Sequence, residues 1–166
     1  MKSFAIFLVF VVLLGSCSTT KHIPANDKLY TGATVIVKGP PTVRERKELK
    51  ADLSGLTRPK PNSKLLGVPV KLMFYNMFYN AKKGLFKNLR DKLGQPPVLL
   101  SQLDLDANIK LLQNYTENKG YFQAKTTGDT TIKRKKASAK YTVETGPRYS
   151  INKVQFPTDS SDLSLA

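Results

Sequence analysis

The spacing of apolar and polar residues changes along the chain and predicts different elements in turn. Residues 30–38 are mostly β-branched or aromatic and are followed by Gly39-Pro40-Pro41, so we expect a strand that ends at this breaker. Thr42 and Glu45 then match a capping box, which predicts the start of a helix. Three leucines at i, i+4 and i+7 form the stripe by which this helix is expected to face a core: Leu49, Leu53 and Leu56.

The second half of the chain predicts one helix and two strands. Apolar residues recur at helical spacing from about Leu103 to Asn118, and Lys119-Gly120 supplies a favourable helix end. The period then becomes two. Residues 123–135 are rich in threonine and predict a strand that is bent or bulged at Gly128. Residues 137–144 alternate strictly between apolar and polar side chains, which is typical of a half-buried antiparallel strand.

A long basic segment, residues 58–100, separates the two predicted helices. It contains Met-Phe-Tyr-Asn twice in succession, at 73–76 and 77–80, and this spacing would stack like residues on one helix face as a docking ridge. Residues 82–93 predict an amphipathic helix that either lies on an anionic membrane or packs onto its own domain. The cations expected to face a membrane are Lys82, Lys83, Lys87 and Arg90.

The start of the chain predicts export. Lys2 precedes an apolar run over residues 4–14, which matches a secretory signal and is shorter than the roughly 20 residues that span a bilayer. The run ends in Leu14-Gly15-Ser16-Cys17, which resembles a bacterial lipobox. The resemblance implies cleavage before Cys17 and acyl chains on that residue, which would attach the protein permanently to a membrane. The alternative is an ordinary signal peptide in which the cysteine is incidental.

Composition narrows the chemistry that the chain can perform. The net charge is +15, and because an exported protein rarely meets nucleic acid, we expect an anionic membrane or an acidic client as partner, or a solvated basic surface without a ligand. A single cysteine and a single histidine, His22 in a polar stretch, cannot build a disulfide framework or a metal cluster. With no recognisable nucleophile triad, paired catalytic carboxylates or phosphate loop, we expect no enzyme activity and no cofactor beyond the lipid on Cys17.

Breakers and composition divide the chain into segments. We expect a signal peptide at 1–16, a lipidated tether at 17–29, a first domain at 30–146 with its insert at about 58–100, and the start of a truncated second unit at 147–166. Residues 151–156 are predicted to form a strand that opens this second unit.

The order of strand, helix, basic insert, helix, strand and strand is similar to that of a POTRA (polypeptide-transport-associated) domain. This is an α+β fold in which two helices pack on a three-stranded mixed sheet. In the second half, three segments resemble the junction between consecutive POTRA domains in BamA/TamA-type outer-membrane proteins: LLQNY at 111–115, GYFQA at 120–124 and YTVETGPRYSI at 141–151. In the first half, further motifs resemble the lipidated TamA-like branch called TamL: the lipobox, Thr20–Pro24, Lys60-Pro61-Asn62, Leu66-Gly67, Tyr75-Asn76 and Gly94–Pro97. Pro59 departs from the polar residue usual in the family.

The resemblance implies the N-terminal part of an outer-membrane assembly factor, anchored by lipid at the outer membrane and facing the periplasm. Its partners would be unfolded outer-membrane-protein clients, membrane lipid and a subunit that spans the inner membrane, with no nucleic acid. The open edge of a small sheet can take up an extended client by β-augmentation, and the threonine-rich strand is the expected edge. Its expected residues are Thr126, Gly128, Thr130 and Ile132. The alternative is a stand-alone basic lipoprotein that binds an anionic component of the cell envelope.

Overall fold

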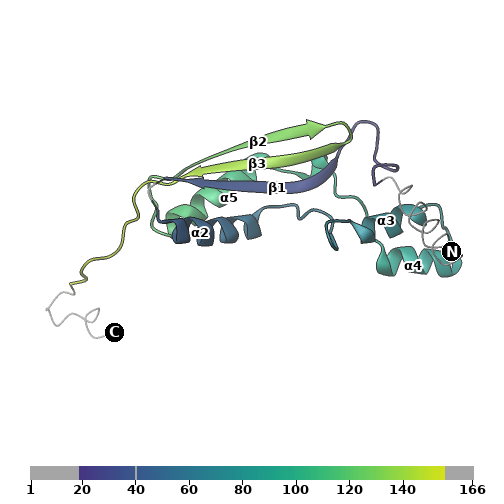
Figure 1. The fold of residues 1–166 in the computed structure, drawn as a ribbon, viewed down its shortest axis with the longest axis horizontal. Helices are drawn as coiled ribbons and strands as arrows, with labels where there is room; N and C mark the ends of the chain where they lie inside the picture. Colours follow the sequence, from purple (N-terminus) through teal and green to yellow (C-terminus); the bar gives the residue numbers. More distant parts are fainter. Residues whose placement is uncertain (1–18, 40, 156–166) are drawn as a thin grey trace, which may run out of the picture.

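The computed structural model of the chain describes residues 19–39 and 41–155. These residues form an α+β structure with a three-stranded mixed sheet and four α-helices (Figure 1). The elements in chain order are β1 (Leu29–Lys38), α2 (Val43–Leu56), α3 (Val70–Met77), α4 (Gly84–Leu93), the 3₁₀ helix η1 (Leu100–Gln102), α5 (Leu105–Asn118), β2 (Lys125–Lys133) and β3 (Lys136–Glu144). The predicted signal peptide, the lipobox residues 14–17 and residues 156–166 lie outside the described part.

β3 is the central strand of the sheet, whose order is β1-β3-β2. β1 runs parallel to β3, and β2 runs antiparallel to it with Gly128 opposite Tyr141. The predicted bulge at Gly128 is wrong, because the register of β2 on β3 is continuous. The irregularity instead lies in β1 between Tyr30 and Ala33, where one extra residue is accommodated and Gly32 adopts a φ of +120° that favours glycine.

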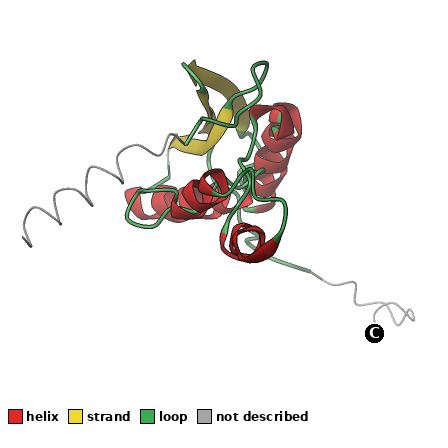
Figure 2. Cartoon of the chain, turned by 90° about the vertical axis from the view of Figure 1, so that its right-hand side faces the viewer, coloured by secondary structure: helices red, strands yellow, loops and turns green. Residues whose placement is uncertain are grey.

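The core lies between one face of the sheet and the helices α2 and α5, as Figure 2 shows by the gathering of helices on one side of the strands. The predicted alternation in β3 is confirmed by its buried residues: Ala137, Ala139, Tyr141 and Val143. Leu49 and Leu53 of α2 are buried as predicted, Leu56 is partly buried, and Leu112 completes the cluster from α5. Each fully buried leucine contributes about 1.5–3 kcal/mol.

Both long helices begin at residues with side-chain caps. The Oγ1 of Thr42 accepts a hydrogen bond from the Glu45 N–H at 3.3 Å, and the Glu45 carboxylate accepts one from the Thr42 N–H at 2.9 Å, which confirms the capping box. Asp104 accepts a hydrogen bond from the Ala107 N–H at 2.8 Å. Because Asp104 is the cap, α5 begins at Leu105, slightly later than the pattern predicted.

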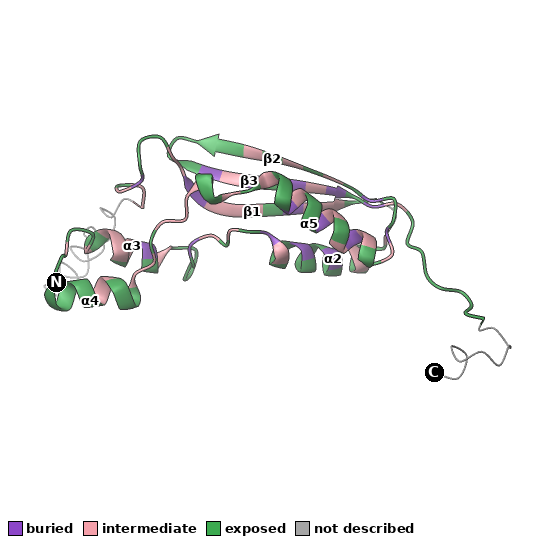
Figure 3. Ribbon diagram, turned by 180° about the vertical axis from the view of Figure 1, so that it is seen from behind, coloured by how far each residue is buried: buried purple, intermediate pink, exposed green. Residues whose placement is uncertain are grey.

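The insert forms a smaller body beyond the end of the sheet at which β1 begins (Figures 1 and 3). Its own buried cluster joins three aliphatic side chains, with Leu99 packed beside them: Ile23, Leu29 and Leu72. The ring of His22 stacks on Tyr79 with a centroid distance of 4.0 Å. His22, Ile23 and Leu29 lie within the segment predicted as a lipidated tether, and their side chains pack against the insert.

Two further boundaries differ from the sequence prediction. Helix α4 begins at Gly84, so Lys82 and Lys83 precede the helix; Lys83 is extended and Gly84 has a φ of +77°. The predicted strand at 151–156 is not formed over its described residues, 151–155, because no other described strand lies beside them to pair with. Across residues 19–39 and 41–155, none of the helices has the length and apolar character that crossing a bilayer requires.

Candidate functional site

The two edges of the sheet differ in how much of their backbone is already paired. At the start of β1, the Tyr30 N–H donates to the Val98 carbonyl at 2.8 Å, and the Leu100 N–H donates to the Lys28 carbonyl at 2.9 Å. Residues 98–100 therefore cover this end of the β1 edge. The outer side of β2 pairs with no other backbone segment among the described residues. β2 is thus an edge strand, as predicted, and it is the more open of the two.

The hydrogen bonds of β3 decide which backbone groups of β2 point outward. The Leu29 N–H donates to the Lys135 carbonyl, and the Thr145 N–H donates to the Lys38 carbonyl, so odd-numbered positions in and beside β3 direct their groups toward β1. Because this direction alternates along a strand, even-numbered residues of β3 face β2, where their partners are odd-numbered. The N–H and C=O groups that point away from the sheet belong to Thr126, Gly128, Thr130 and Ile132.

Gly128 has no side chain, and the side chains of Thr126, Thr130 and Ile132 do not point out of the edge. The four positions lie opposite the four buried residues of β3 and therefore share the face that the helices cover. Thr126, Gly128 and Thr130 are half-buried, and only Ile132, near the hairpin, is largely exposed at 54%. The structure thus brings the predicted residues together as a row of outward backbone groups, not as a row of side chains. Within this row, the Thr130 N–H already donates to the Asp129 carboxylate at 2.7 Å.

The opposite face of β2 is polar and exposed. Its side chains, on the face away from the helices, are Lys125, Thr127, Asp129, Thr131 and Lys133. Lysines on an edge strand keep it soluble and disfavour indiscriminate pairing with other sheets. The backbone of this edge can therefore pair with an incoming strand, while its lysines disfavour self-association of the protein.

Gly128 allows α5 to approach this strand closely. A Cβ atom at Gly128 would lie 3.0 Å from two ring atoms of Tyr141 and 3.1 Å from Cδ1 of Ile109. Carbon atoms in ordinary contact are about 3.5–4.0 Å apart. The glycine that the sequence assigned to a bulge instead lies where an added Cβ would be tightly packed.

The predicted membrane-facing cations of the insert have different environments. Arg90 is largely covered, and its Nη1 donates to the carbonyls of Tyr79 and Ala81 at 3.1 Å each, so its guanidinium closes the loop between α3 and α4. Lys87 lies 3.7 Å from Asp91, whose carboxyl pKa is lowered chiefly by the hydrogen bond from Arg90. Lys82 and Lys83 are exposed. Arg90 therefore holds the loop between α3 and α4, and the expectation that these cations face a membrane stays a prediction.

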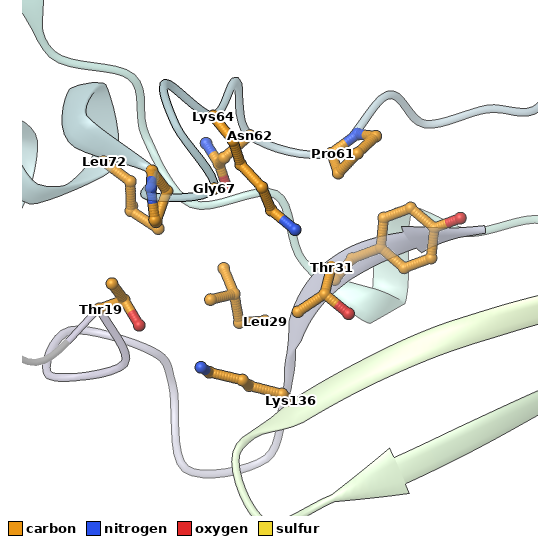
Figure 4. Close-up of a pocket in the computed structure, with 11 residues that line it drawn as sticks. Thr19, Leu29, Thr31, Pro61, Asn62, Lys64, Gly67, Leu72 and Lys136 are labelled. Carbon is orange, nitrogen blue, oxygen red and sulfur yellow. The ribbon is translucent and has the colours of Figure 1, made fainter. Parts of the chain in front are cut away.

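A cavity of about 140 Å³ lies where the insert meets the sheet (Figure 4). The side chains of Lys64 and Lys136 extend into it from different segments, and Thr19 and Leu29 also line it. Sequence reasoning missed this cavity, because its walls come from segments more than a hundred positions apart and no local pattern connects them.

The chemistry visible in the described residues is that of binding. No group of three or more histidine, cysteine, aspartate or glutamate side chains within 19–39 and 41–155 could hold a metal ion. The clearest pKa shift in the core belongs to Tyr30, whose pKa burial raises to about 12 because a phenolate would lose its hydration there. The expectations that the chain is not an enzyme and needs no cofactor stay predictions.

The chain was compared with family models, curated proteins and solved structures, and none of them matches it.

Proposed function

We propose that this chain is the N-terminal, POTRA-like part of a lipid-anchored outer-membrane assembly factor, and that the outer edge of β2 binds extended segments of unfolded client proteins. The fold supports the proposal, because α2 and α5 pack on one face of a three-stranded mixed sheet in the element order of a POTRA domain. The insert between these helices is an enlargement of that plan.

The observation that carries the proposal is the row of outward backbone groups at four alternate positions of β2. β2 has nine residues, so its edge offers about 30 Å of pairing length, enough for a client strand of five or six residues. Pairing through backbone groups does not depend on the client's side chains. A protein that handles many different unfolded clients requires this tolerance.

The proposed lipid on Cys17 would place the insert, and not the sheet, against the bilayer. Thr19 follows Cys17 by two positions, and two residues span at most about 7 Å. Thr19 lies against the insert: its carbonyl accepts a hydrogen bond from Asn76 of α3 at 3.3 Å. The described chain leaves the sheet at the end away from the insert (Figure 1). The client-binding edge would therefore extend from the anchor into the periplasm. A partner subunit that spans the inner membrane remains part of the proposal.

A pair of substitutions at Thr130 tests the edge. Thr130→Pro removes an outward N–H, together with its 2.7 Å hydrogen bond to the Asp129 carboxylate, and obstructs a pairing strand. An edge strand tolerates proline on the side that faces away from the sheet. Thr130→Val keeps both the N–H and a β-branched side chain. Fluorescence anisotropy with an extended outer-membrane-protein peptide should show binding weakened at least about tenfold by the proline and retained with the valine. Equal peptide affinity of a folded Thr130→Pro variant, with folding checked by circular dichroism, would refute the proposal.

The alternative, a stand-alone lipoprotein that binds an anionic component of the envelope, is favoured by the two ammonium groups of Lys64 and Lys136 in the cavity of Figure 4. NMR titration with inorganic phosphate distinguishes the two functions. Saturable shifts at Lys64 and Lys136, together with no response of β2 to client peptides, would support this alternative.

A further inference from the structure

The turn at residues 65–68 places a leucine where the backbone disfavours it. Leu65 and Val68 exchange two backbone hydrogen bonds, of 2.8 and 3.0 Å, around the central pair Leu66-Gly67. Leu66 has a φ of +49° and Gly67 one of +81°. Turns with two positive φ angles favour asparagine or aspartate followed by glycine, and a branched aliphatic residue is strained there.

Leu66 gains no compensating contact within the described residues. Its exposed fraction is 98%, and the flanking Leu65 and Val68 are 67% and 45% exposed. A polar residue would fit this turn better on both counts, backbone and solvation. The turn is therefore an exposed apolar projection, and no contact within the described fold offsets the backbone strain and solvent exposure of Leu66.

A second exposed apolar surface lies on α4 and the end of α3. Leu85 and Phe86, in the first turn of α4, are 70% and 57% exposed, and Met77 is 57% exposed. The ring of Phe86 stacks on Phe78 with a centroid distance of 5.3 Å, which joins the two helices into one apolar face. In Figures 1 and 3 the 65–68 turn and α4 both project on the side of the molecule away from the sheet.

The charged residues around these apolar elements are almost all positive. Residues 58–97 contain nine lysine or arginine residues and one acidic residue, Asp91. Asp91 is itself occupied by Arg90 at 2.9 Å and Lys87 at 3.7 Å. Exposed leucine and phenylalanine surrounded by lysine match the boundary between the phosphates and the acyl chains of an anionic bilayer.

The start of the described chain lies beside this surface. Thr19, Lys64 and Gly67 line the same cavity, so the segment that follows Cys17 reaches the base of the turn. We propose that the 65–68 turn and the first turn of α4 insert into an anionic phospholipid surface, with Lys64, Lys82 and Lys83 on the lipid phosphates. This contact is separate from any acyl chain on Cys17 and from the β2 edge.

The test uses residues 17–166 carrying Cys17→Ser, so that binding cannot come from an acyl chain. Co-sedimentation should show binding to phosphatidylglycerol vesicles, weak binding to phosphatidylcholine vesicles, and loss of binding at high salt. Leu66→Asn suits the turn better than leucine, so the variant should fold at least as stably as the parent. It should nevertheless bind phosphatidylglycerol at least about tenfold more weakly, because a buried leucine side chain is lost from the lipid.

Ile151→Asn is the matched control, because Ile151 is 84% exposed and lies near the last described residue, outside the insert, so its replacement should leave vesicle binding unchanged. A second arm, Lys82→Ala with Lys83→Ala, should weaken binding to phosphatidylglycerol vesicles and reduce its salt dependence. Unchanged vesicle affinity of Leu66→Asn would overturn the proposal. A parent protein that binds neither lipid would also overturn it. So would a Leu66→Asn variant that loses self-association, measured by light scattering, but keeps its vesicle binding.

Discussion

Replacing Gly128 by alanine tests how tightly β2 is packed on the core. The added Cβ would lie 3.0 Å from Cδ1 and Cε1 of Tyr141 and 3.1 Å from Cδ1 of Ile109. The Tyr141 ring has no exposed surface and cannot move away freely. Overpacking of this kind costs about 1–3 kcal/mol, against about 0.4–1 kcal/mol gained because alanine restricts the unfolded chain. We expect a net loss of about 1–2 kcal/mol in the free energy of unfolding.

Gly55→Ala is the control for this measurement. Gly55 lies in α2, and no atom lies within 4 Å of the Cβ that alanine would add, so this variant should gain about 0.5–1 kcal/mol. Ile109→Val removes one of the three close contacts and should cost less in the Gly128→Ala background than in the parent. Urea unfolding followed by circular dichroism measures the parent, the three single variants and the double variant. A Gly128→Ala variant as stable as the parent, alongside a stabilised Gly55→Ala, would refute the packing argument.

Three further predictions concern the fold. Leu53 is fully buried, so Leu53→Ala should lower the free energy of unfolding in urea by about 2–5 kcal/mol. Thr42→Ala removes the α2 cap and should cost about 1 kcal/mol in the same assay, whereas Thr131→Ala on the exposed face of β2 should change little. Burial raises the pKa of Tyr30 from 10.0 to about 12, so the folded protein keeps a proton that the unfolded chain releases. The resulting stability is complete below pH 10 and is lost as the pH rises through 12; unfolding measured across this range should show less of that loss in Tyr30→Phe.

The elements on either side of the insert could be predicted because each has a regular period and clear end signals. The capping box at Thr42 and the strict alternation of 137–144 needed no knowledge of the rest of the chain, and both are confirmed. The edge position of β2 was predicted from its threonine-rich, weakly apolar sequence, and the sheet order confirms it.

The sequence is less informative where the structure depends on distant contacts. Two glycines occur in predicted strands, and only the pairing register shows that the irregularity lies beside Gly32. Only the packed structure shows that Gly128 lies close to Tyr141 and Ile109. Ile23 reads as part of a polar tether because Leu72, which covers it, lies far away in the sequence. Arg90 reads as a surface cation because its carbonyl partners come from the loop between α3 and α4. The apolar turn at Leu66 has no periodicity by which it could be recognised.

Amide hydrogen exchange along β2, with and without an extended client peptide, tests the proposed client-binding edge most directly. The outward N–H groups belong to Thr126, Gly128, Thr130 and Ile132, and the odd-numbered residues between them face β3. Bound peptide should therefore slow exchange at the four even-numbered positions and leave the odd-numbered positions unchanged. Protection without this alternation, or confined to the insert, would contradict strand addition at this edge.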